Sequence, residues 1–129
     1  LVETLETVTF WSRLPRVYDE VKAAVADSLG EGTLVLCHIS HVYETGASLY
    51  FTVAAKQAED PIAQWWAAKA AASDAIIEHG GSITHHHAVG QDHVPWLARE
   101  IGPVGVGVLR ALKAELDPAG VLNPGVLVP

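Results

Sequence analysis

Three consecutive histidines, His85, His86 and His87, form the densest group of chemically versatile side chains in this sequence. They follow a Gly80-Gly81 dipeptide, within the sequence SITHHHAVG of residues 82–90. Imidazole titrates near neutral pH and can donate a hydrogen bond, accept one or ligate a metal ion. In an extended segment, His85 and His87 point to one face and His86 to the other. The run suits proton transfer or ligand binding, and the alternative is a polar loop with incidental histidines.

A predicted β-hairpin supplies a second group of polar side chains. A strand over residues 33–43, a turn at 44–46 and a returning strand over 47–56 have alternating polar and apolar residues. The apolar face of this hairpin carries Val35, Cys37, Ile39, Leu49, Phe51 and Val53. The polar face carries His38, Ser40, Ser48, Tyr50 and Thr52. A polar face of an antiparallel sheet often does no more than meet water.

The remaining elements must position these groups. They are a strand over 1–11, a helix from Ser12 to Leu29, a helix from Asp60 to about His79, a strand that begins at Ser82, and helices over 93–101 and 103–116 followed by a turn-rich tail. Ser12 and Asp60 are the expected N-caps, and a proline lies in the first turn of each helix. Trp65 and Trp66 are expected in the core, and Gly102-Pro103 is expected to break the last helical stretch.

The order of these elements predicts an α+β fold. A β-α-β-β-α-β order is the ferredoxin-like arrangement, in which an antiparallel four-stranded sheet has both helices on one face. The C-terminal helices and the tail would be added to it. The uncovered face would then bring Tyr50, His38 and the histidine strand together, which makes an incidental grouping a weaker explanation.

Composition limits the class of protein. The 129 residues, 50% of them hydrophobic, suit a single domain over residues 1–129 with a buried core. A net charge of −7 argues against nucleic acid and anionic membranes as partners. The single Cys37 fits a reducing, cytoplasmic compartment, and no apolar run is long enough to span a bilayer. Because the chain begins at Leu1 and contains no methionine, we expect a fragment of a longer protein.

Several of these motifs resemble those of one enzyme family. The SITHHHAVG sequence, Pro95-Trp96-Leu97, the Asp117-Pro118 tail and the hairpin sequence VYETGASLYF over 42–51 are similar to the C-terminal part of alkyldihydroxyacetonephosphate (alkylglycerone-phosphate) synthases. These enzymes are flavoproteins of the FAD-linked oxidase superfamily. The resemblance implies the cap and C-terminal part of such an enzyme, with the FAD-binding N-terminal domain lying upstream.

The resemblance also implies a reaction and the residues that carry it. The family exchanges the acyl group of acyl-dihydroxyacetone phosphate for a fatty alcohol through a flavin adduct, in ether-lipid synthesis. Tyr50 would be the catalytic acid/base. His85, His86 and His87 would polarise the substrate, while His86, His87 and Asn123 would also help to hold FAD. The fragment alone is expected to be inactive and to bind FAD weakly or not at all.

Other classes of function remain open. Asn123-Pro124-Gly125 is typical of redox-active FAD-linked oxidases, and Gln91-Asp92 replaces basic residues expected after the histidines. The chain could therefore belong to an oxidase or dehydrogenase of a hydroxyacid or an alcohol. A stand-alone ferredoxin-like module is a third hypothesis, in which His38, His85 and His87 ligate Zn²⁺ or Ni²⁺ or the site takes another ligand. A structural module that forms a homodimer is a fourth.

Overall fold

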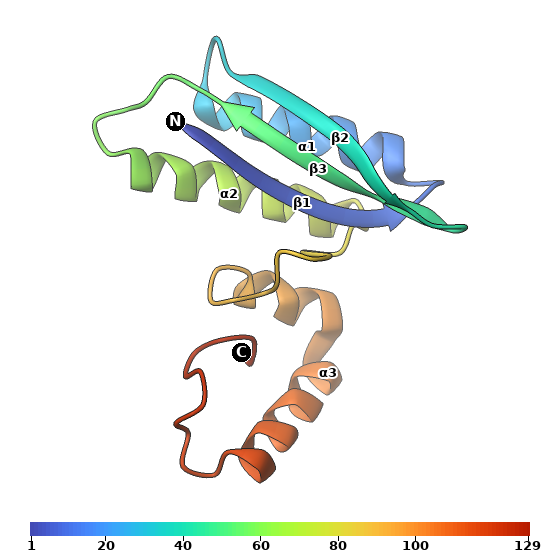
Figure 1. Ribbon diagram of the computed structural model, residues 1–129, viewed down its shortest axis with the longest axis vertical. Coiled ribbons are helices and arrows are strands. Elements are labelled where there is room, and N and C mark those ends of the chain that lie inside the picture. The colour runs from blue at the N-terminus through green and yellow to red at the C-terminus, as the bar shows by residue number, and fades with distance from the viewer. The chain divides into compact units, whose positions relative to one another are not determined.

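The computed structural model describes residues 1–129, and internal contacts divide them into two compact units, Leu1–His87 and Ala88–Pro129. The first unit contains β1 (Val2–Phe10), α1 (Leu14–Leu29), β2 (Leu34–Val42), β3 (Gly46–Ala54) and α2 (Pro61–Glu78) (Figure 1). The second unit contains α3 (Val94–Leu116) and the tail that follows it. None of the three helices is both long and apolar enough to cross a membrane.

The three strands form one antiparallel sheet in the order β1-β3-β2. The predicted hairpin of β2 and β3 is confirmed, and β1 pairs with the other edge of β3. Glu6 lies opposite Tyr50, and Tyr50 lies opposite His38, so these three residues form one row across the sheet. Because side chains alternate between the two faces of a strand, the whole row points to one face.

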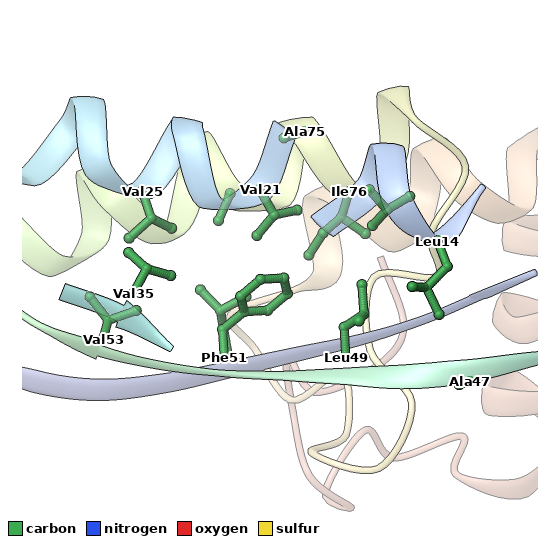
Figure 2. Packing of buried hydrophobic residues seen from close by; sticks show 13 residues of the cluster. Leu14, Val21, Val25, Val35, Ala47, Leu49, Phe51, Val53, Ala75 and Ile76 are labelled. Carbon is green, nitrogen blue, oxygen red and sulfur yellow. The ribbon is translucent and has the colours of Figure 1, made fainter. Parts of the chain in front are cut away.

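Both α1 and α2 pack on the other face of the sheet (Figure 2). The core there is built from β-strand residues and from one stripe of each helix, including Val17, Val21, Val25, Leu49, Phe51, Val53, Ala72 and Ile76. The α+β class with two helices on one sheet face is therefore confirmed. We call the sheet face that neither helix covers the open face. Its strand residues include Glu6, Ser40, Ser48, Tyr50 and Thr52.

The beginnings of the two helices differ in how well the sequence predicts them. At α2, the Asp60 side chain accepts a hydrogen bond from the Ala63 N–H at 3.0 Å, as expected for an N-cap. At α1, however, the N-cap is Arg13, and no side chain caps the helix, so the predicted Ser12 cap is wrong. Within α2, Trp65 packs against the core, while Trp66 is 44% exposed with the Lys69 ammonium over its ring.

The predicted fourth strand does not form. After α2, the Ser82 N–H donates to the Val8 carbonyl at 2.9 Å, and this single bridge to β1 is the only strand-like pairing of the segment. The chain then turns, and the N–H groups of the next three histidines all point to one carboxylate oxygen. Successive N–H groups of a strand point in opposite directions, so this arrangement excludes a strand.

The Gly80-Gly81 dipeptide brings the segment to this position. Gly80 has a φ of 80°, a left-handed conformation that glycine adopts without steric cost. A Cβ atom on Gly81 would lie 2.7 Å from Oγ1 of Thr7 and 3.0 Å from a methyl group of Ile76. Only glycine therefore allows the chain to pass this closely between α2 and β1.

The second unit is a kinked helix with an ordered tail. The break predicted at Gly102-Pro103 is confirmed, since Gly102 has a φ of 69° within α3. Asp117 organises the tail by accepting hydrogen bonds from the Lys113 ammonium and from the N–H groups of Val121 and Leu122. The Lys113 side chain, helped by these backbone donors, holds the pKa of the Asp117 carboxyl below its usual value.

Candidate functional site

Aromatic and imidazole rings gather on the open face of the first unit. The loop Thr84–His87, which we call the histidine segment, lies beside the open-face residues of β3 and the end of β2. Of the residues predicted from the sequence, Tyr50, His85, His86 and His87 are brought together. Asn123 belongs to the second unit, where it has a φ of 44° and its carbonyl accepts the Val126 N–H.

Tyr50 contacts two of the three histidines. Its ring lies 6.1 Å from that of His86, at an interplanar angle of 20°, and 5.2 Å from that of His87, at 88°. The ring of His86 in turn lies 4.8 Å from that of His87. The phenol therefore projects from a rigid central strand into a group of imidazoles, which can donate or accept protons.

Glu6 of β1 holds the histidine segment in place through its carboxylate. The sequence pattern did not single out this residue. The residue is 3% exposed, although it comes from an edge strand. One carboxylate oxygen, Oε1, accepts hydrogen bonds from Thr84 Oγ1 at 2.6 Å and from the N–H groups of His85, His86 and His87 at 2.7, 2.9 and 3.0 Å. Burial by itself raises the pKa of the Glu6 carboxyl. The four hydrogen bonds together lower it by more than burial raises it, so the pKa lies below its usual value.

His41 takes the place that strand alternation predicts for His38. A register shift between Ser40 and Val42 interrupts the ladder of β2 and β3, and His41 has a φ of 44° there. The irregularity turns the His41 ring to the histidine segment, where it lies 5.0 Å from the ring of His85 and 4.8 Å from that of His86. His38 shares a row with Tyr50 on the open face but makes none of these ring contacts, so its predicted place among the histidines is wrong.

A chain of hydrogen bonds links the rings at the end of the hairpin. The Tyr43 hydroxyl lies 2.9 Å from Nε2 of His85, and Nδ1 of His85 lies 3.1 Å from Nδ1 of His86. Because one of two facing nitrogens must donate and the other accept, the protonation of His85 and that of His86 are linked.

Three of the histidines also have the arrangement of a loose metal-ligand group. One ring nitrogen from each of His41, His85 and His86 lies within 4.8 Å of the others. Zinc bound at about 2.0–2.1 Å by each imidazole would need these nitrogens closer together. The group shares only His85 with the set His38, His85 and His87 that the sequence suggested.

The signals for the residues that sequence reasoning missed were present but weak. Glu6 is an acidic residue in the middle of a strand, a position that usually indicates a solvated face. Tyr43 and His41 lie near the turn of the hairpin, where strand alternation no longer predicts orientation. Only the fold of the histidine segment over β1 makes Glu6 a buried residue.

The open-face residues fit a planar aromatic cofactor such as the flavin of FAD. The rings of Tyr50, His86 and His87 offer a polar aromatic surface, and the residues His86 and His87 are accessible to solvent. Imidazole and phenol groups can hydrogen-bond the edge of a heterocycle or move a proton beside it. The pyrophosphate-binding glycine-rich sequence of an FAD domain is not found in residues 1–129.

The chain is similar to known proteins over nearly its whole length. The chain is 36% identical over 132 residues to the alkyldihydroxyacetonephosphate synthase of Dictyostelium discoideum, covering 99% of this chain and 22% of that protein. It is 33% identical over 131 residues to the synthase of Trypanosoma brucei brucei, covering 98% of this chain and 21% of that protein. A solved alkyldihydroxyacetonephosphate synthase structure matches 95% of this chain, and 20% of its own chain, with a TM-score of 0.62 at 28% identity.

The present chain thus spans about a fifth of the length of these relatives. The model of the family described as "FAD linked oxidases, C-terminal domain" matches residues 1–127, nearly all of the chain. The chain therefore belongs to the FAD-linked oxidase C-terminal domain family.

Proposed function

We propose that this chain covers the flavin and the substrate in an FAD-dependent enzyme of the alkylglycerone-phosphate synthase type. The enzyme would exchange the acyl group of acyl-dihydroxyacetone phosphate for a fatty alcohol. The single observation that carries this proposal is the grouping of Tyr50 with His86 and His87 on the open face. Family membership and the similarity to synthases over 98–99% of the chain support it.

The residues of this chain have separate tasks in the proposal. The phenol of Tyr50 moves a proton at the substrate carbon next to the carbonyl group. The imidazoles of His86 and His87 accept or return that proton and polarise the substrate oxygens. FAD, when bound, supplies the chemistry by which the carbon–oxygen bonds are exchanged. Asn123 is the residue of the second unit that the resemblance to the synthases assigns to FAD binding.

The experiment is to measure acyl-for-alkyl exchange with the full-length protein that contains this chain. Tyr50→Phe and His86→Ala should each lower kcat by about 10²-fold or more, because both remove a proton-transfer group. Tyr18→Phe is the matched control, since Tyr18 stacks on Phe51 at the opposite sheet face. Turnover of both site variants at the wild-type rate would contradict the proposal.

The same protein tests the redox alternative. After anaerobic mixing with a hydroxyacid or an alcohol, an oxidase or dehydrogenase leaves most of its bound flavin reduced. The exchange reaction has no net redox change and leaves the flavin oxidised. Stopped-flow absorbance of the flavin distinguishes the two. If a hydroxyacid causes a lasting loss of the absorbance of oxidised flavin, and no acyl group is exchanged, the result favours the oxidase.

A further inference from the structure

We infer that Glu6 is a positioning residue that shapes the histidine segment through one carboxylate oxygen and sets the tautomer of His86 through the other. The consequence of the His86 tautomer for catalysis rests on the proposed function, whereas the assignment of the tautomer is independent of it. Nothing in the resemblance to the synthases points to Glu6.

The first oxygen, Oε1, already has all the donors that it can take. Three consecutive N–H groups and the Thr84 hydroxyl converge on it, at 2.6–3.0 Å. Successive N–H groups that point to one centre form an anion-binding concavity, and here the anion is part of the protein. A neutral side chain of the same shape can accept some of these bonds, but only through the oxygen in this position.

The second oxygen, Oε2, is buried and has no hydrogen-bond partner. A buried acceptor without a donor costs free energy, and native proteins rarely leave one unpaired. Nδ1 of His86, which can donate, lies 3.4 Å from Oε2. A small rotation of this partly exposed ring brings an Nδ1–H into hydrogen-bond contact with Oε2, and this interaction favours the proton on Nδ1.

The proton on His86 then fixes the direction of the next hydrogen bonds. Nδ1 of His85, which lies 3.1 Å from Nδ1 of His86, then faces an N–H group and must carry a lone pair, so the single Nδ1–H of His86 is shared between Oε2 of Glu6 and this nitrogen. The proton of a neutral His85 is then on Nε2, which donates to the Tyr43 hydroxyl at 2.9 Å. Nε2 of His86 is left with a lone pair, as a general base needs. A single buried carboxylate thus orients two imidazoles and one phenol.

Glu6→Gln tests this because it replaces the hydrogen-bond acceptor that faces His86 with a hydrogen-bond donor. The amide oxygen stays with the four donors, since turning the amide over would place its NH₂ against the three backbone N–H groups and lose their hydrogen bonds. The amide NH₂ then takes the place of Oε2 and donates to Nδ1 of His86, which must become an acceptor. The proton of the neutral ring is expected to move to Nε2. Glu3→Gln, the same change at an exposed position of β1, is the matched control.

The measurement is ¹⁵N NMR of the full-length protein with ¹⁵N-labelled histidine, at a pH at which imidazole is neutral. The His86 signals are assigned by their loss in His86→Ala. We expect the Nδ1–H tautomer in the wild type and in Glu3→Gln, and the Nε2–H tautomer in Glu6→Gln. An Nε2–H tautomer of His86 in the wild type overturns the inference, even if Glu6→Gln fails to fold. An unchanged tautomer in folded Glu6→Gln overturns it too.

Activity separates this inference from the proposed function. If both hold, Glu6→Gln lowers kcat for acyl exchange by about 10²-fold, because the base nitrogen of His86 is blocked by a proton. If the tautomer moves and the exchange rate does not change, the role of Glu6 is supported and the catalytic role of His86 is wrong.

Discussion

The hydroxyl of Tyr43 lies 2.9 Å from Nε2 of His85, although 42 positions separate the two residues. Tyr43 directly follows β2, and His85 belongs to a loop that has left the sheet. The contact ties the end of the hairpin to the histidine segment on the side opposite Glu6. The segment is therefore held through its backbone by a carboxylate and through a ring by a phenol.

We expect Tyr43→Phe to have a small effect on stability and a larger one on catalysis. An exposed hydrogen bond contributes about 1 kcal/mol or less to the free energy of unfolding. Loss of the bond frees the His85 ring, so kcat of the full-length enzyme should fall by roughly 10-fold. Steady-state kinetics and urea denaturation of the same variant measure both effects. Tyr18→Phe, on the helix-covered face, should change neither by this amount.

The Glu6 carboxylate should make stability depend on acid. Its folded-state pKa lies below the ordinary value of 4.5, because the hydrogen bonds to the carboxylate outweigh its burial. The charged group therefore stabilises the folded chain above pH 4.5, and this contribution is lost as the pH falls through the folded-state pKa. Urea denaturation from roughly pH 3 to roughly pH 7, which spans the carboxyl range, should show a steeper loss in the wild type than in Glu6→Gln.

Glu3→Gln supplies the control for that acid dependence. Glu3 is exposed on the same strand and accepts none of the hydrogen bonds of the histidine segment. Its variant should keep the wild-type slope of stability against pH. Equal slopes in wild type and Glu6→Gln would contradict the assigned role of the buried carboxylate.

The core that supports Tyr50 is expected to be sensitive at Phe51. This ring is fully buried and stacks on Tyr18 with a centroid distance of 6.2 Å. Phe51→Ala leaves a cavity under the central strand and should cost about 3–5 kcal/mol of unfolding free energy. Urea denaturation measures the loss. Ile62→Ala, at a residue of α2 that is 71% exposed, should stay within about 0.5 kcal/mol of the wild type.

Cys37 should react slowly with alkylating reagents. Burial raises the pKa of its thiol to about 11, although a hydrogen bond from the Tyr50 backbone opposes part of the shift. Only the thiolate is nucleophilic, so iodoacetamide at about pH 8 should modify the folded protein roughly 10²-fold more slowly than the urea-unfolded chain. Mass spectrometry follows the modification. Equal rates in the two states would show that the thiol is not protected.

Local pattern in the sequence was enough to predict most of the scaffold. Polar and apolar residues alternate in β3, so alternation alone assigns Tyr50 and Phe51 to opposite faces of the sheet. The stripe that includes Val17, Val21 and Val25 has helical spacing, and α1 buries all three residues. Asp60 before Pro61 marked the start of α2. Each of these features depends on residues within a few positions of one another.

Tertiary structure decided the rest of the site. The register shift that turns His41 to the open face has no periodic signal, so strand alternation favoured His38 in its place. Glu6 and His85 are 79 positions apart, and the carboxylate is buried only because the loop after α2 folds over β1. A hydrogen bond between such distant residues depends on how the whole chain packs, and spacing along the sequence carries no record of it.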